Sequence, residues 1–257
     1  MLNVEIIFNP LEQFEIRDYL SLNISFLNNM KISLTNISIY LTIGFLILIF
    51  FNTIENNYNR VIYNKWIIVR DCIYDTIHSI VRGQINNHKG QGYFPFIYTL
   101  FLFILISNLI GMIPYSFAST SHFILTFGLS FTLVLGSTFL AFRIHGLEFF
   151  SLFVPAGCPL ALLPLLVLIE FISYLARNIS LGLRLAANIL SGHMLLNILS
   201  GFTYNIMKTG KLNFFLGLLP MGFILAFSGL ELGIALIQAQ VFIVLSCSYI
   251  KDGLDLH

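Results

Sequence analysis

The chain has 257 residues, of which 57% are hydrophobic and only 10% are charged, and its formal net charge is +1. A soluble domain is usually about a quarter charged, so this composition excludes a fully water-exposed surface. The near-neutral charge also argues against nucleic acid as a partner. Several long runs contain no charged residue, and each is near or above the roughly 20 residues that cross a bilayer as a helix. The sequence therefore predicts an all-α polytopic membrane protein, held in a lipid bilayer as one membrane domain over residues 1–257.

The N-terminal third is predicted to contain an arm, one span and one surface helix. Residues 1–32 are mixed in polarity and are expected to form an N-terminal arm outside the membrane, and residues 34–54 are the first span. Residues 61–82 repeat apolar side chains at steps of three or four with charged side chains between them. This pattern predicts an amphipathic helix in the interface plane. A helix packed on a partner subunit is the alternative that the pattern leaves open.

The middle and the end of the chain are predicted to form two helical hairpins. Residues 95–142 contain two apolar runs separated by a polar turn, at 95–114 and 122–142. Residues 160–250 contain two much longer runs, at 160–207 and 212–250, which predict a turn near Tyr204–Asn213.

The last hairpin is too long to stand upright in a bilayer. Its second helix has 39 residues, or about 58 Å at 1.5 Å per residue, against about 30 Å of hydrocarbon. We therefore expect about five membrane helices and one interfacial amphipathic helix, ending in a long, strongly tilted C-terminal helix hairpin.

Basic residues predict which way the chain faces, because they gather on the inner side of a membrane. Five spans place seven basic residues on one side and four on the other, so the C-terminus is expected on the inner side. The larger set is Arg60, Lys65, Arg70, Arg82, Lys89, Arg143 and Lys251, and the smaller is Arg17, Lys31, Lys208 and Lys211.

Charged residues inside the apolar helices are the clearest functional signal. Glu170, Arg177 and Arg184 are seven residues apart, and two helical turns make about 7.2 residues, so the three share one stripe. A charge at the centre of a membrane helix costs about 2.5–3.5 kcal/mol. Charges retained at that cost indicate a function or a fixed partner.

The next helix carries a matching polar stripe. Glu231 and Gln238 are also seven residues apart, and Asn188 and His193 accompany the arginines on the preceding helix. Glu and His can release and take up a proton, whereas Arg stays charged because its pKa exceeds about 12. Two such stripes on adjacent helices predict a hydrated proton path. The structural alternative is that the acids neutralise the arginines and that the amides link the helices by hydrogen bonds.

Several segments resemble subunit a (subunit 6) of mitochondrial F-type ATP synthases, and the resemblance covers essentially the whole chain. The most specific match is the sequence SLGLRLAANILSGH at Ser180–His193, followed by ELGIALIQAQVF at Glu231–Phe242. The sequence NLIGMIPYSF at Asn108–Phe117 is similar to the first hairpin of the family. NPLEQFEI at Asn9–Ile16 is similar to the N-terminal region of fungal members.

The resemblance implies a role for each residue that matches the motif. Arg184 falls on the arginine that faces a ring of c subunits, each of which has one ionisable carboxylate. His193 and Glu231 fall on the half-channel open to the intermembrane space, and Glu170 and Asp252 fall on the matrix half-channel.

Three further residues complete the predicted proton path. Arg177 matches the second arginine of mitochondrial members. Asn188 and Gln238 lie on the polar stripes beside the matched groups.

The family implies that the chain is a proton-conducting stator subunit of the mitochondrial inner membrane. It would couple proton flow to ring rotation and ATP synthesis, with the c ring and the other stator and membrane-sector subunits as partners. No ATP-binding motif is present, so the chain is expected to be a non-catalytic subunit. The sequence predicts neither a cofactor nor a metal site. The alternative is a proton-coupled secondary transporter, which would require an internal repeat or broken midplane helices. We find no repeat.

Overall fold

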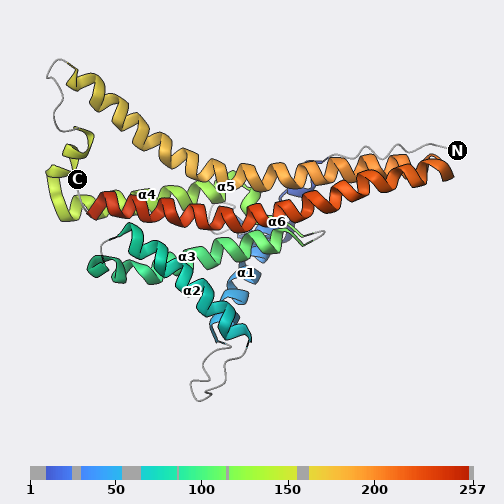
Figure 1. Ribbon diagram of the computed structural model, residues 1–257, viewed down its shortest axis with the longest axis horizontal. Helices are drawn as coiled ribbons and strands as arrows, with labels where there is room; N and C mark the ends of the chain where they lie inside the picture. Colours follow the sequence, from blue (N-terminus) through green and yellow to red (C-terminus); the bar gives the residue numbers. More distant parts are fainter. Residues whose placement is uncertain are drawn as a thin grey trace.

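The computed structural model describes residues 10–24, 30–53, 65–85, 87–113, 116–154 and 162–254. Figure 1 shows these residues as a set of long helices with a small ribbon near the N-terminus. The elements are η1 (Glu12–Phe14), β1 (Asp18–Ile24), β2 (Met30–Thr35), α1 (Asn36–Thr53), α2 (Lys65–Gln84), α3 (Asn87–Gly111), η2 (Ser119–Ser121), α4 (Phe123–His145), η3 (Gly146–Phe153), α5 (Leu163–Lys208) and α6 (Lys211–Leu254).

Five of these helices are long and apolar enough to cross a membrane, namely α1, α3, α4, α5 and α6. The predicted all-α polytopic fold is therefore confirmed. Helix α2 has 20 residues but is not one of these five, since its charged residues lower its hydropathy. Parts of the predicted segments, at residues 1–9, 25–29, 54, 61–64, 114 and 160–161, together with Arg60, lie outside the described residues.

A small antiparallel ribbon in the N-terminal arm was not predicted. Strand β1 pairs with β2 so that Ser21 lies opposite Ser33. The ribbon is joined to α1 by Asn36, whose side-chain amide donates a 2.9 Å hydrogen bond to the carbonyl oxygen of Glu15. The Asn36 side-chain oxygen also accepts a 3.0 Å bond from the N–H of Ile37 at the start of the helix. This residue therefore fixes the direction in which α1 leaves the arm.

The buried core lies where α3 and α4 pack against the C-terminal half of α6. Leu102 and Ile104 of α3 and Phe242 and Ile243 of α6 are almost completely buried. Figure 1 shows that the C-terminal half of α5 runs alongside α6, whereas its N-terminal part diverges from α6. The core thus holds α6 firmly and leaves one face of α5 open.

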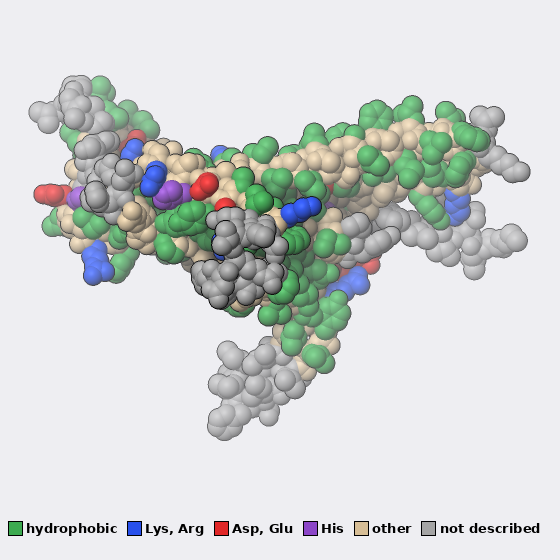
Figure 2. Space-filling model, turned by 60° about the horizontal axis from the view of Figure 1, so that its bottom comes forward, with side chains coloured by type: hydrophobic (Ala, Val, Ile, Leu, Met, Phe, Trp, Pro, Cys, Tyr) green, Lys and Arg blue, Asp and Glu red, His purple; other side chains and the backbone are tan. Residues whose placement is uncertain are grey.

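The hairpin of α5 and α6 projects beyond the rest of the molecule. The two helices have 46 and 44 residues, which correspond to about 69 and 66 Å. They are joined at Thr209–Gly210, within the region in which the sequence predicts a turn. Figure 2 shows few charged side chains along the projecting part on the visible face. The steep tilt of this hairpin in a membrane stays a prediction.

Cysteine labelling tests the predicted orientation. Leu147 in η3 and Gly210 in the hairpin turn are both exposed, and five spans place them on opposite sides. In a parent variant in which Cys72 and Cys158 are replaced by Ser, Leu147→Cys should react with an impermeant thiol reagent only from the inner side. Gly210→Cys should react only from the outer side. Labelling of both cysteines from the same side would contradict the five-span topology.

Candidate functional site

Arg184 lies on the open face of α5. Its neighbours Leu181 and Leu185 are buried against the rest of the fold, whereas Arg184 and Leu183 are exposed. The structure contains no ion pair between Arg184 and any carboxylate of the described residues. A guanidinium cannot neutralise itself by losing a proton. Arg184 therefore keeps its positive charge on the open face of α5.

His193 and Glu231 meet across the two long helices. The Nε2 atom of His193 in α5 lies 3.8 Å from Oε1 of Glu231 in α6, and the side chains are 16% and 4% exposed. This separation exceeds the roughly 3.2 Å limit of an ordinary hydrogen bond. Neither Nε2 of His193 nor the carboxylate oxygens of Glu231 have another hydrogen-bond partner among the described residues. A small side-chain shift or one water molecule would join the two groups.

Asn188 and Gln238 form a second contact between the same helices. The amide of Asn188 donates a 3.0 Å hydrogen bond to the side-chain oxygen of Gln238. Both residues line a cavity of about 390 Å³ between α5 and α6, and Glu231 lines the same cavity. Asn188 is four residues, or about 6 Å, along the helix from Arg184. The cavity therefore extends from Glu231 to Asn188, about one helical turn from Arg184, and His193 is not among its lining residues.

Gly192 provides the space that Glu231 occupies. A Cβ atom at residue 192 would lie 2.5 Å from Oε1 and 2.8 Å from the carboxyl carbon of Glu231. Any larger residue at this position would force the carboxylate to move.

The structure adds polar residues at this end that sequence reasoning did not select. Asn108 of α3 is buried and donates a 3.3 Å hydrogen bond to the carbonyl oxygen of Ala235 in α6, while its own side-chain oxygen has no partner among the described residues. Thr120 of η2 is also buried, and its hydroxyl has no partner there. Asn108 could have been selected from the sequence, because it is a polar amide inside an otherwise apolar span.

A separate cluster forms around Arg177. Its Nη1 atom lies 3.4 Å from Oδ2 of Asp252, and its Nη2 atom lies 4.0 Å from Oε1 of Glu170. These three side chains are between 35% and 42% exposed. Exposed ion pairs contribute only about 0–1 kcal/mol, so these contacts can open and re-form easily.

Arg184 separates the two clusters along α5. Arg177 precedes it by seven residues, or about 10 Å, and His193 follows it by nine residues, or about 14 Å. The structure thus brings the predicted residues together as three groups: His193 with Glu231, Asn188 with Gln238, and Arg177 with Glu170 and Asp252. Arg184 joins none of them. Groups that can take up and release a proton therefore lie on both sides of Arg184 along α5.

Comparisons with known proteins identify the family. The chain matches the family model described as ATP synthase A chain over residues 37–251. It is 68% identical over 257 residues to ATP synthase subunit a of Emericella nidulans, covering 100% of both chains. It is 70% identical over 251 residues to ATP synthase subunit a of Neurospora crassa, covering 98% of this chain and 95% of the relative. A match to ATP synthase subunit a of Candida glabrata is 49% identical over 249 residues, with 97% and 96% coverage. With matches of this length and identity to fungal relatives, the chain belongs to the ATP synthase A chain family.

Proposed function

We propose that this chain is the proton-conducting stator subunit of a mitochondrial ATP synthase, with two proton half-channels and an arginine that faces the c ring. Family membership and the five apolar helices make it a multi-pass subunit of the ATP synthase membrane sector. The proposal adds the proton path, the ring contact and a location in the mitochondrial inner membrane. Its main support is a single observation: Arg184 is exposed and unpaired among the described residues, between two clusters of polar side chains.

The outer half-channel is assigned to the cavity between α5 and α6. A proton from the outer side would reach Glu231 or His193, which are 3.8 Å apart. It would then pass the Asn188–Gln238 hydrogen bond to a carboxylate of the ring. Neutralising that carboxylate lets it face lipid, because the cost of a charge in the bilayer is removed.

The inner half-channel is assigned to Glu170, Arg177 and Asp252. The two carboxylates would receive the proton that a ring carboxylate releases, and their exposure to water would let it leave. Arg177 keeps both acids close, since it donates a 3.4 Å hydrogen bond to Asp252 and its Nη2 atom lies 4.0 Å from Glu170.

Arg184 would hold the ionised ring carboxylate between the two half-channels. Because Arg cannot pass a proton on, it would also block direct flow from one half-channel to the other. Each proton that crosses contributes about 2.3 kcal/mol per 100 mV. Ring rotation would deliver that work to the catalytic head of the enzyme.

Exchange of Gly192 tests whether the position of Glu231 matters. Gly192→Ala should slow proton flux by at least about tenfold, since a misplacement of about 1 Å can cost roughly 100-fold in a proton-transfer step. Flux is measured as acidification of reconstituted vesicles. Gly233→Ala is the matched control, because a Cβ atom there meets nothing within 4 Å. Equal flux in both variants would show that the Glu231 geometry is not limiting.

Purification of the complex tests the assignment against a secondary transporter. A stator subunit should be isolated in one particle with a ring of small carboxylate-bearing subunits and a soluble ATPase, as measured by the mass of the intact complex. Isolation of an active proton-coupled carrier without a ring would contradict the proposal.

A further inference from the structure

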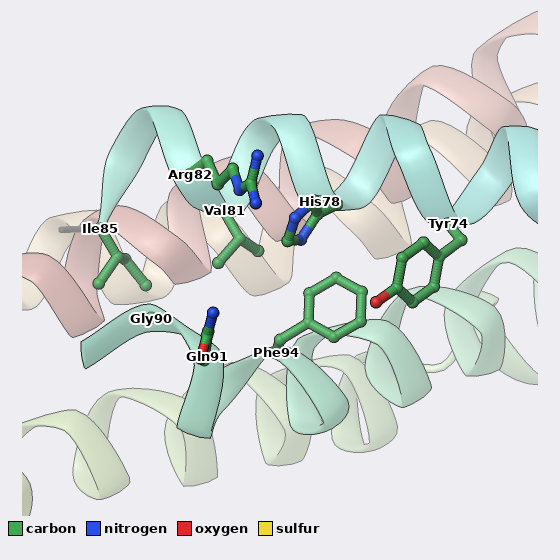
Figure 3. Close-up of a pocket in the computed structure, with 8 residues that line it drawn as sticks. All are labelled: Tyr74, His78, Val81, Arg82, Ile85, Gly90, Gln91 and Phe94. Atoms are coloured by element: carbon green, nitrogen blue, oxygen red, sulfur yellow. The ribbon is translucent and has the colours of Figure 1, made fainter. Parts of the chain in front are cut away.

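We propose that a pocket between α2 and α3 binds the phosphate of an anionic phospholipid from the inner leaflet. The pocket has a volume of about 230 Å³ and lies where the end of α2 meets the start of α3. Figure 3 shows side chains from both helices facing this space. The lining residues are Tyr74, His78, Val81, Arg82, Ile85, Gly90, Gln91 and Phe94.

The spacing of α2 places three polar side chains of the pocket in one row. Tyr74, His78 and Arg82 are four residues apart, so they lie above one another on the helix. The neighbouring Val81 and Ile85 are buried in the hydrophobic core. The pocket therefore lies along the border between the packed face of α2 and its open face.

The pocket offers positive charge and hydrogen-bond donors. Arg82 is exposed and has no ion-pair partner among the residues that the structure describes. The Nδ1 atom of His78 is enclosed and has no hydrogen-bond partner in the same set. Gln91 and Tyr74 can donate further hydrogen bonds, and no carboxylate lines the pocket. This combination selects an anion, and a guanidinium fits a phosphate with two parallel hydrogen bonds.

Aromatic rings hold the imidazole of His78 in position. Its ring stacks on Tyr74 with centroids 5.8 Å apart and meets the edge of Phe94 at 5.4 Å. Together with Val81 and Ile85, these rings give the pocket an apolar wall beside its polar groups. An organic phosphate suits such a wall better than a free inorganic ion, because its attached carbons would pack there.

The position of the pocket favours a lipid as the source of that phosphate. The candidate membrane span of α3 begins at Gly90, so the pocket lies at the level where the chain enters the membrane. Basic pockets between membrane helices at this level on the inner side bind anionic headgroups.

The size of the pocket limits which part of a lipid can enter it. Pockets for whole small molecules are roughly 300–1,000 Å³, so this smaller pocket suits a headgroup whose acyl chains remain outside. A bound lipid would fasten α2 to the membrane surface and fix its packing against the core. That role is independent of the proton path.

Photolabelling tests the proposal on the intact ATP synthase complex. The complex is placed in nanodiscs of phosphatidylcholine that contain a photoreactive phosphatidylglycerol, and adducts on this chain are mapped by mass spectrometry. Arg82→Gln should reduce labelling around the pocket about tenfold, the effect expected from one lost charge-assisted hydrogen bond. Arg143→Gln is the matched control, since it removes an exposed arginine of the same predicted side that does not line the pocket. Labelling in that variant should change less than about twofold.

Other outcomes would overturn the proposal. Equal labelling in both variants would show that Arg82 does not bind the lipid. Loss of labelling in millimolar inorganic phosphate would show that the pocket binds a free anion. If Arg82→Gln does not assemble, a density map of the unmodified complex in the same nanodiscs decides the matter. The expected feature is a phosphate between Arg82 and His78, and a partner protein segment or an empty pocket would contradict it.

Discussion

Replacing Arg184 by Ala should abolish proton-driven ATP synthesis while the complex remains assembled. An ionised ring carboxylate would then face the apolar surface of α5 without a positive partner. An unpaired charge at the centre of a membrane costs about 2.5–3.5 kcal/mol, and each 1.36 kcal/mol is tenfold in rate. Synthesis should therefore fall by roughly 70- to 400-fold, close to complete loss. Loss of the barrier between the half-channels should also open a passive proton leak.

Two companion variants make this prediction specific. Arg184→Lys keeps the charge but loses the planar fork of the guanidinium, so we expect severe impairment rather than rescue. Arg143→Gln removes an arginine outside the site and should retain synthesis. Both ATP synthesis and passive proton conductance are measured in reconstituted vesicles. Normal coupled synthesis with Ala at residue 184 would return this arginine to a structural role.

Replacing Glu231 by Gln should slow proton flux strongly without removing assembly. The side chain is 4% exposed and lies 3.8 Å from His193, so it is the acid of the cluster proposed as the outer half-channel. Glutamine keeps the size of the side chain but cannot carry a proton. A positioned proton-transfer group contributes roughly 100-fold or more, and we expect a loss near the lower end because water can partly replace it.

The matched control for this variant is Glu148→Gln. Glu148 is exposed in η3, so the same chemical change there should leave the flux unaltered. Acidification of vesicles under an imposed potential gives the flux, and the intact mass of the complex gives its assembly. Unchanged flux in Glu231→Gln would exclude this carboxylate from the proton path.

The helical fold could be predicted because its signals are local. The sequence shows charge-free runs that are long enough to cross a bilayer. It also shows the seven-residue spacing of Glu170, Arg177 and Arg184. The N-terminal ribbon could not be predicted in the same way. Its strands are short, and they depend on pairing with each other and on the hydrogen bonds of Asn36.

The contacts of the site were only partly accessible from the sequence. Polar stripes on two adjacent helices pointed to the same region for His193 and Glu231. The hydrogen bond from Asn108 to Ala235 could not be predicted, because the two residues are 127 apart along the chain. They meet only because α3 packs on α6. The periodicity of the sequence predicted that α2 is amphipathic. It could not predict the pocket, which forms only because the start of α3 lies beside Arg82.

A density map of the complete complex, at a resolution that shows side chains, tests the central claim most directly. The proposed function predicts that Arg184 faces a carboxylate-bearing helix of the c ring. It also predicts that the cavity lined by Glu231 and Asn188 opens to one side of the membrane and the Arg177 cluster to the other. A map in which Arg184 instead pairs with a carboxylate of its own chain, or faces lipid away from the ring, would contradict it.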